Sequence, residues 1–381
     1  MGNPVVYPIF FLLLAALVYQ VLALCCLWRF CSQSQSPDPS PSLPGITVFK
    51  PLKGLDETTR ECLESFLTQD YHPYQVIFGV KNAADPLLPL LQELQRAFPR
   101  PQTEIVICPE TLGLNPKVST LRQLEPQALY DLLVIADADV KVGPDFLSQV
   151  AAALQEPGVG LVSCLYRAGP VQTLGAGLEA LTISADFIPS VATAFYVEGI
   201  RFALGATMAL SRQALAAGGG LAALADFLAD DYQLGWRVAQ AGYRVRVLPY
   251  VVETSNPRMG FKEYLGHQLR WARTYRVCRP RGYLAYGITH ALIYSLALFL
   301  ASGWAPWALG LLGATLAIRA TLAAFSERRA LQGSLPWFFF PLLPLKDFLS
   351  GIIWLLSFLA NRVTWGRRAY RLTREGKLAE E

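Results

Sequence analysis

The sequence predicts an α/β domain, with a mainly parallel sheet covered by helices on both faces, carried between membrane-spanning helices near the two ends. Two observations support this. Continuously apolar runs alternate with helical patterns between residues 46 and 136, which is typical of a parallel sheet buried on both faces. The chain is also 53% hydrophobic and only 16% charged, against roughly 25% charged in an average globular domain, and the apolar excess lies toward the ends.

The first predicted element is a membrane anchor at residues 1–31. Residues 7–28 contain no charge, and about 20 helical residues cross the hydrocarbon layer. A cleaved signal peptide is the alternative, but no basic segment precedes the run, which is also longer than a typical signal-peptide core. Residues 32–45 are rich in Ser and Pro and predict a linker.

Residues 46–260 form the predicted central domain. Its first half alternates strands with helices: strands at 46–49, 75–80, 103–108 and 132–136, and helices at 56–69, 86–98 and after residue 117. Ligands of such sheets bind beyond the carboxyl ends of the strands. The first strand is followed by neither a dinucleotide fingerprint nor a phosphate loop, which disfavours a Rossmann oxidoreductase and a P-loop enzyme.

Asp137 and Asp139 follow the buried strand 132–136, which directs them toward this ligand-binding edge. Two carboxylates there suit Mg²⁺ or Mn²⁺, because such cations take a few carboxylate oxygens and complete their shell with diphosphate oxygens. The D-x-D pattern alone is a weak signal, since aspartates are common in turns.

Other polar side chains follow the neighbouring strands. Asp85 comes after the second strand, and Asn115 and Lys117 come after the third. Each alone is equally typical of a helix cap or a surface charge. Since the carboxyl ends of parallel strands meet at one edge, we expect these side chains to converge with the D-x-D pair.

Two later segments add candidates. Asp230 and Asp231 open a predicted helix, where they either complement its dipole or supply a general base. Residues 261–283 predict a basic amphipathic helix suited to an anionic lipid surface. On that helix, Arg270 could bind a diphosphate while Trp271 packs beside a sugar or its acceptor.

Residues 284–326 predict two further spans, at 286–303 and 305–325, joined by a short uncharged turn. Arg319, inside the second, is expected to extend toward a polar surface.

A third apolar stretch at 335–360 is interrupted by prolines, Lys346 and Asp347. Each half is too short to cross a bilayer, so we predict a re-entrant or interfacial hairpin, with a kinked span as the alternative.

Basic residues follow the spans, including Arg29 and the tail at 361–381. The positive-inside rule therefore predicts that the central domain and the tail are cytosolic, with the N-terminus outside. A net charge of +4 gives no case for nucleic-acid binding. The seven cysteines include no C-x-x-C pair, so neither a zinc site nor a disulfide framework is predicted.

In their order along the chain, these motifs resemble the membrane-bound glycosyltransferases of the GT-A fold. The shared features are Asp85, the D-x-D pair, the acidic pair before Tyr232, and the Arg-Trp of a Q/R-x-x-R-W motif. More narrowly, KPLKG, GLNPK and ADDYQLG are similar to the ceramide glucosyltransferase family. FALGATMALSR and HQLRWART resemble its bacterial, hopanoid-associated members most. The resemblance covers residues 46–281 and, loosely, the C-terminal spans.

The resemblance implies that Asp85 contacts the uridine of a UDP-sugar, that Asp137 and Asp139 hold the metal ion and the diphosphate, and that Asp231 is the catalytic base. Further predicted contacts to the donor or acceptor come from Lys53, Asn115, Lys117, Arg270, Trp271, Asp230 and His267. His267 stands where the family pattern has Gln or Arg, although a histidine can still donate a hydrogen bond. A structural role is the alternative for this residue.

The resulting hypothesis is an inverting, metal-dependent transfer from UDP-glucose to a membrane-lipid hydroxyl such as that of ceramide. UDP-N-acetylglucosamine with a hopanoid polyol, or a diacylglycerol acceptor, are the alternatives. A processive polysaccharide synthase usually needs more spans, and a non-catalytic membrane scaffold would tolerate loss of Asp231. We expect an integral membrane protein whose catalytic domain lies on the cytoplasmic face of a bacterial inner or thylakoid-like membrane.

Overall fold

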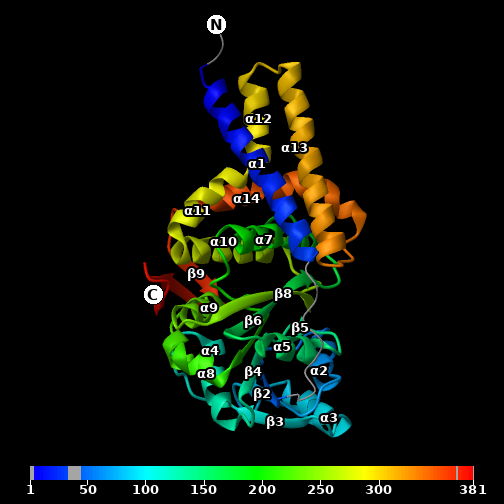
Figure 1. Ribbon diagram of the computed structural model, residues 1–381, viewed down its shortest axis with the longest axis vertical. Helices are drawn as coiled ribbons and strands as arrows, with labels where there is room; N and C mark the ends of the chain where they lie inside the picture. The colour runs from blue at the N-terminus through cyan, green and yellow to red at the C-terminus, as the bar shows by residue number, and fades with distance from the viewer. Residues whose placement is uncertain (1–3, 33–43, 366–367, 381) are drawn as a thin grey trace.

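The computed structural model describes residues 4–32, 44–365 and 368–380, so most of the predicted linker at 32–45 lies outside the described residues. Upright helices stand above a layer of helices that run crosswise to them, and a mixed α/β domain lies below that layer (Figure 1).

The central sheet has eight strands in the order β3-β2-β1-β4-β7-β6-β8-β5. Its first four strands are mutually parallel: β1 (Ile46–Pro51), β2 (Tyr74–Val80), β3 (Gln102–Ile107) and β4 (Leu132–Ala136). The other four are β5 (Val140–Lys141), β6 (Val159–Ala168), β7 (Thr207–Ser211) and β8 (Arg244–Thr254). Strands β6 and β8 are parallel, whereas β7 and β5 are antiparallel to their neighbours. The mainly parallel sheet is thus confirmed, with an antiparallel component that we did not predict.

Both faces of the sheet are covered, as its apolar strands require. One face packs against α2 (Thr59–Leu67), α3 (Leu88–Ala97) and α5 (Phe146–Leu154), and the other against α4 (Pro116–Leu124), α8 (Arg212–Ala217) and α9 (Asp230–Gln240). In β4, Val134 belongs to the first core and its neighbours Leu133 and Ile135 to the second. The period of two along a strand therefore supplies both cores from one apolar run.

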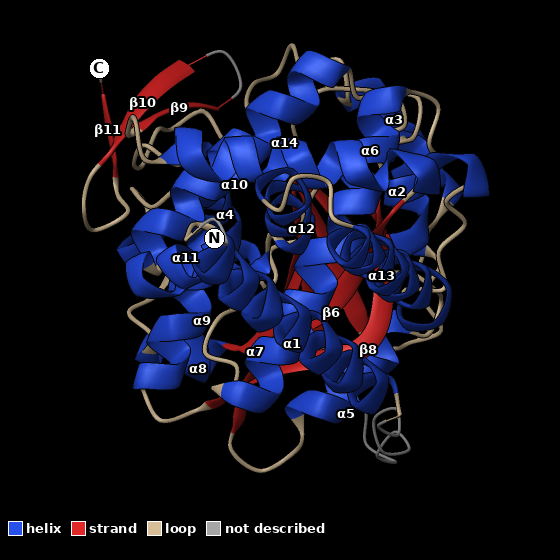
Figure 2. Cartoon of the chain, turned by 90° about the horizontal axis from the view of Figure 1, so that it is seen from above, coloured by secondary structure: helices blue, strands red, loops and turns tan. Residues whose placement is uncertain are grey.

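The upright helices are α1 (Val6–Cys31), α12 (Ala291–Ala301) and α13 (Pro306–Phe325), which pack through Leu13, Leu298 and Ala308. Figure 2 shows them from above, over β6 and β8. By length and composition, four helical segments of the described chain could cross a membrane: Val6–Cys31, Leu174–Val197, Pro306–Ala330 and Trp337–Ser357. A fifth is the pair Pro280–Thr289 and Ala291–Ala301, bent by 50°.

The crosswise layer includes α7 (Ile188–Val197), α10 (Phe261–Cys278), α11 (Pro280–Tyr286) and α14 (Leu343–Ser357). Helix α6 (Leu174–Thr182) packs against α10 and is joined to α7 by the short π-helix η2 (Ile183–Phe187). The helix predicted over 261–283 is divided, because Pro280 cannot continue α10 and instead begins α11. The stretch 335–360, for which we predicted a re-entrant or interfacial hairpin or a kinked span, contains one long helix. Pro341 and Pro344 fall in a short lead-in turn, η6 (Trp337–Leu342), and in the first turn of α14, where proline is tolerated, so α14 continues unbroken.

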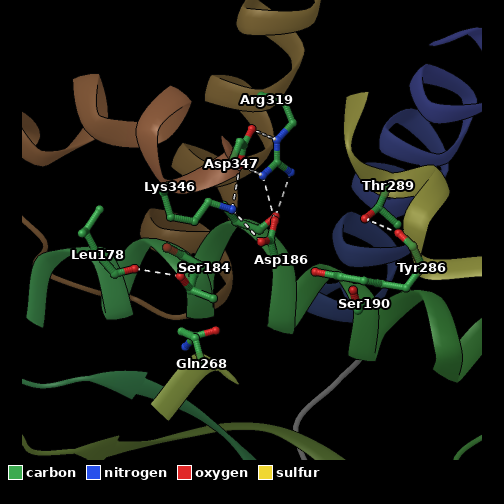
Figure 3. A network of polar contacts seen from close by, with 12 residues as sticks. Leu178, Ser184, Asp186, Ser190, Gln268, Tyr286, Thr289, Arg319, Lys346 and Asp347 are labelled. Atoms are coloured by element: carbon green, nitrogen blue, oxygen red, sulfur yellow. Dashed lines mark hydrogen bonds and ion pairs between the residues drawn. The ribbon is translucent and has the colours of Figure 1, made fainter. Parts of the chain in front are cut away.

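Four charged side chains join α13, α14 and η2 below the upright helices, and we call Asp186, Arg319, Lys346 and Asp347 the ion quartet (Figure 3). Arg319 Nη2 lies 2.7 Å from Asp186 Oδ1 and 2.6 Å from Asp347 Oδ1. Lys346 Nζ lies 2.6 Å from Asp186 Oδ2 and 2.7 Å from Asp347 Oδ1. Arg319 also donates to Gln20 of α1 at 3.1 Å. The expectation that Arg319 extends to a polar surface is therefore wrong, because its partners lie inside the protein.

The described part of the C-terminal tail forms a small antiparallel sheet, where we had expected only a basic tail at 361–381. Its strands are β9 (Arg362–Trp365), β10 (Arg368–Leu372) and β11 (Leu378–Glu380), with β10 in the centre. Val363, Tyr370 and Leu372 are buried against Val277 of α10. This sheet lies at the periphery in Figure 2.

Candidate active site

Asp137 and Asp139 lie in the short connection between β4 and β5, at the carboxyl end of β4. The Asp137 backbone N–H donates to the Ala206 carbonyl at 3.2 Å, which fixes the D-x-D segment against the residues that precede β7. The sheet therefore places the aspartate pair at the edge that the apolar strand predicted.

Lys117 connects this pair to the start of α9. Its Nζ lies 2.6 Å from Asp137 Oδ1 and 3.3 Å from Asp230 Oδ2. Burial opposes the charge on Lys117, but the carboxylates of Asp137 and Asp230 outweigh it and raise the pKa of the lysine above its usual value. Segments far apart in the sequence are thus joined by one ammonium group.

Asn115 has a structural part in this arrangement. Its Oδ1 accepts from the Val118 N–H at 3.0 Å and caps α4, while its Nδ2 donates to the Phe227 carbonyl at 2.8 Å. Asn115 is fully buried. The cap and the tether to Phe227 hold the start of α4, and hence Lys117, beside α9.

Asp230 and Asp231 lie in the first turn of α9, and Lys117 links Asp230 to Asp137. We call the four aspartates 137, 139, 230 and 231 the carboxylate cluster. The position of Asp231 depends on Gly205, because a Cβ there would stand 2.7 Å from Asp231 Oδ2. Gly205 precedes Ala206, which binds the D-x-D segment. Gly205 lies in the FALGAT segment, which we had noted in the sequence, but the sequence did not show that this glycine packs against Asp231.

The cluster carries more negative charge than its surroundings neutralise. Burial and then the neighbouring Asp230 raise the pKa of Asp231 to about 7, and burial with Asp137 raises that of Asp139 to about 6. The Asp139 side chain is nevertheless solvent-accessible. Protein atoms therefore surround this carboxylate while water, or a ligand, still reaches it.

A second lysine was missed by the sequence prediction. Lys50 of β1 is fully buried, and its Nζ donates to the carbonyl of Asp137 at 2.5 Å. Burial lowers its pKa to about 8. The motif KPLKG contains both Lys50 and Lys53, and we had chosen Lys53, which is exposed and has no partner described among the residues 4–32, 44–365 and 368–380.

The helix α10 contributes an aromatic wall. The Trp271 ring centroid lies 4.6 Å from His267, 5.8 Å from Phe187 and 6.2 Å from Tyr275. Phe187 in turn lies 5.0 Å from Tyr166 of β6. The Tyr232 hydroxyl donates to the Cys278 carbonyl at 3.3 Å, so the end of α10 contacts the start of α9.

Glu179 of α6 is buried beside His267, and its charge also acts on Arg270. The His267 Nδ1 lies 2.9 Å from Glu179 Oε1. Burial lowers the pKa of Arg270, and the charge of Glu179 acts in the opposite direction. Burial raises the pKa of Tyr166, and the nearby charges of Glu179, Asp231 and Asp137 raise it further. The aromatic wall of α10 and the carboxylate cluster therefore belong to one region.

Asp85 is not joined to the cluster. Its Oδ1 accepts from the Leu87 N–H at 3.0 Å, in the turn before α3. Topology places this turn at the same edge of the sheet, since β2 is parallel to β1 and β1 to β4. A contact between Asp85 and a nucleotide stays a prediction. A surface hollow of about 400 Å³ lies nearby, lined by Leu55, Asp56, Arg60, Pro86, Pro89, Leu90 and Glu93, and it contains none of the candidate residues.

No group of three or more His, Cys, Asp or Glu in the described chain is arranged to hold a metal ion by itself. The donor set still fits a hard divalent cation, because Mg²⁺ commonly takes one or two carboxylates and fills its remaining positions with water and substrate phosphates. Burial and then the charge of Asp137 raise the pKa of Asp139, and a cation bound between the two carboxylates would oppose both effects.

The sequence profile of the family described as glycosyl transferase family 21 matches residues 8–378. The chain belongs to glycosyl transferase family 21. Ceramide glucosyltransferase 1 of Caenorhabditis elegans is 21% identical over 90% of this chain and 74% of its own length. Ceramide glucosyltransferase 3 of the same organism is 24% identical over 61% of this chain. The match spans about half of that relative, 50% of its length.

The fold is also that of a solved glycosyltransferase. The mannosyltransferase PcManGT from Pyrobaculum calidifontis, solved in complex with GDP-Man and Mn²⁺, has a TM-score of 0.57. The two share 22% sequence identity, and the likeness covers 92% of this chain and 97% of that one. The predicted GT-A fold, with apolar helices near both ends of the chain, is confirmed.

Proposed function

We propose that this family 21 member transfers a sugar from a UDP-sugar, with UDP-glucose as the first candidate, to the hydroxyl of a membrane lipid such as ceramide. The observation that carries the proposal is Asp231, a carboxylate with a raised pKa beside the Lys117-bridged D-x-D segment. The ceramide glucosyltransferases among its relatives support the donor and acceptor classes.

The residues divide the chemistry between them. Asp231 removes the proton of the acceptor hydroxyl, and a pKa near 7 suits a general base that works near neutral pH. The hydroxyl oxygen then bonds to the anomeric carbon of the sugar as the bond to the diphosphate oxygen breaks. The neighbouring carboxylates have other partners, since Lys117 pairs with Asp137 and Asp230, so we infer a single displacement that inverts the anomeric centre.

Positive charge assists the departing diphosphate. Asp137 and Asp139 would hold Mg²⁺ or Mn²⁺, which acts as a Lewis acid on the phosphate oxygens when bound. Lys117 keeps Asp137 in place, and Arg270 supplies a guanidinium suited to a diphosphate. Trp271 offers a flat apolar surface to the sugar or the acceptor.

The membrane geometry supports a lipid acceptor. The crosswise helices separate the upright helices from the α/β domain (Figure 1). The η6 and α14 segment exposes Trp337, Phe338 and Leu355 by 60% or more of each residue's surface. A helix with such a face lies in the headgroup and acyl boundary of one leaflet. We place the α/β domain on the cytoplasmic face, since Arg29 ends α1 on the domain side, in a bacterial inner or thylakoid-like membrane.

The test uses the full-length chain in lipid nanodiscs. The protein is incubated with single UDP-sugars and with ceramide, a diacylglycerol or a hopanoid polyol, in the presence of Mg²⁺ or Mn²⁺. We expect a glycosylated lipid by mass spectrometry, with the inverted anomer by NMR and UDP-glucose with ceramide as the best pair. A retained anomer would refute the single displacement, and no product from any pair would refute the transfer.

A further inference from the structure

A buried carboxylate on α6 lies against the face of α10 that carries the candidate site residues. On α10, Tyr264, His267, Gln268 and Trp271 recur at intervals of three and four and so share one helix face. Tyr264 meets α6 through its hydroxyl, 3.2 Å from Thr182 Oγ1. Glu179 lies between these contacts, with only 9% of its side chain exposed.

Both oxygens of Glu179 are directed to this face of α10. Oε2 accepts from Gln268 Nε2 at 2.7 Å, and Oε1 lies 2.9 Å from His267 Nδ1. Nδ1 is not aligned for a hydrogen bond with this oxygen, but an unprotonated Nδ1 would place its lone pair 2.9 Å from a carboxylate. That repulsion favours the tautomer in which Nδ1 carries the proton. A buried carboxylate without partners is costly, so these two contacts also explain why Glu179 is tolerated within the α6 and α10 interface.

The consequence falls on the histidine ring. An imidazole has two distinct nitrogens, and the partner of one decides which nitrogen carries the proton. With Glu179 at Nδ1, the ring is held in one tautomer and one orientation. That ring lies 4.6 Å from the Trp271 ring, at an interplanar angle of 57°, so an error in its position is passed to Trp271.

We propose that Glu179 is a positioning residue for the transfer, which fixes the tautomer and orientation of His267 and thereby the Trp271 surface. The inference rests on the proposed function. Glutamine and arginine side chains have fixed N–H donors. A neutral histidine carries its proton on either ring nitrogen, so a partner on one nitrogen is needed to select the tautomer. Glu179 supplies that partner from a different helix.

The decisive substitution is Glu179→Gln. Its amide keeps the shape and still accepts from Gln268, but its NH₂ group donates to His267 Nδ1 and selects the other tautomer. An amide in place of a histidine-orienting carboxylate has this effect in other enzymes while it leaves the geometry intact. We expect kcat to fall roughly tenfold or more, with the KM for the UDP-sugar changed less than about twofold.

A double-mutant cycle separates positioning from general damage. His267→Gln sets a new baseline, and in that background Glu179→Gln should add less than about twofold, since no tautomer remains to be selected. Glu93→Gln is the matched control, because Glu93 forms an exposed ion pair with Arg60 away from the candidate site. An equal loss in both backgrounds would overturn the proposal.

A readout independent of activity is available because the chain has only three histidines. In protein labelled with ¹⁵N-histidine, the His267 signals are assigned by their loss in His267→Gln. We expect them to report protonated Nδ1 in the wild type and a changed tautomer in Glu179→Gln. Unchanged signals would refute the pairing even if activity fell. Wild-type protein that transfers no sugar would refute the proposed function, while this measurement would still test the pair.

Discussion

The ion quartet and the carboxylate cluster are both groups of charged side chains, but they differ in burial and in the balance of their charges. In the quartet, two carboxylates meet two cations, and all four ion pairs are 2.7 Å or shorter. In the cluster, the ammonium of Lys117 pairs with two of the four aspartates, Asp137 and Asp230, while Lys50 donates to a backbone carbonyl. The quartet is complete without a ligand, whereas the cluster has an excess of negative charge that a cationic ligand would relieve.

This difference indicates a structural role for the ion quartet and a functional role for the carboxylate cluster. A buried network with every charge paired fixes how elements meet, although it contributes little net stability compared with apolar packing. An incompletely neutralised cluster has perturbed pKa values, which are a mark of functional sites. Consecutive residues of η2 connect the quartet to the aromatic wall of α10, since Asp186 belongs to the quartet and Phe187 packs on Trp271.

The largest effect is expected at the cluster, from Asp231→Asn. Removal of a general base costs typically 10²–10⁴-fold in rate, so sugar transfer should nearly vanish, while the amide preserves the shape of the side chain. Product formation in nanodiscs measures this. Asp131→Asn is the matched control, since the Asp131 side chain is 93% exposed. Equal activity of the Asp231 and Asp131 variants would remove Asp231 from the mechanism and favour a scaffold.

The next effect is expected at the quartet, from Arg319→Met, and it concerns stability. Two buried carboxylates would lose a partner, and removal of one partner of a buried pair costs about 3–5 kcal/mol of unfolding free energy. Denaturant unfolding in detergent micelles measures this loss.

Two further variants check the interpretation of that loss. The paired change Asp186→Leu with Lys346→Met removes one charge of each sign, so it should be milder than Arg319→Met. Arg60→Met breaks an exposed pair with Glu93 and should cost less than about 1 kcal/mol. If Arg319→Met were as mild as Arg60→Met, the quartet would not hold the helices together.

The sequence predicted the cluster better than the quartet, and the reason is physical. Asp137 and Asp139 follow an apolar strand, and the rule that parallel strands end at one edge brings Lys117 to them. The quartet has no such local rule, because Asp186, Arg319 and Lys346 lie in apolar helices where each charge looked isolated. Only the packing of α13 on α14 and η2 shows that they neutralise one another.

The same reasoning explains what was missed in the fold and the site. Strands β6, β7 and β8 were not assigned, and the antiparallel register of β7 depends on long-range pairing with β4. Lys50 was passed over for Lys53, because a lysine inside a buried strand is rare unless it is paired. Glu179 could have been noticed as a charge within an apolar helical segment, which would have marked it as functional or paired.

A smaller effect is expected from divalent cations, which should stabilise the protein through the carboxylate cluster and not through the ion quartet. A ligand that binds only the folded state at a hundredfold excess over its Kd adds about 2.7 kcal/mol. Titration of Mn²⁺ should therefore raise the melting temperature of the wild type, and this shift should disappear in Asp137→Asn with Asp139→Asn. It should persist in Lys346→Met, whose lesion lies in the quartet. A shift lost equally in both variants would mean that Mn²⁺ acts elsewhere.

The smallest effect is a pH dependence of the cluster in which rate and stability move in opposite directions. Asp231 with a pKa of about 7 is mostly protonated at pH 6 and mostly ionised at pH 8, so the rate should rise about tenfold over that interval. The folded protein also holds protons that the unfolded chain releases near pH 4, so the contribution of Asp231 and Asp139 to stability should fall as pH rises from 4 to 7. Rates measured between pH 6 and 8, and denaturant unfolding measured between pH 4 and 7, test the two signs. A rate that falls as pH rises, in protein that stays folded, would contradict Asp231 as the base, because a base works only after it has lost its own proton.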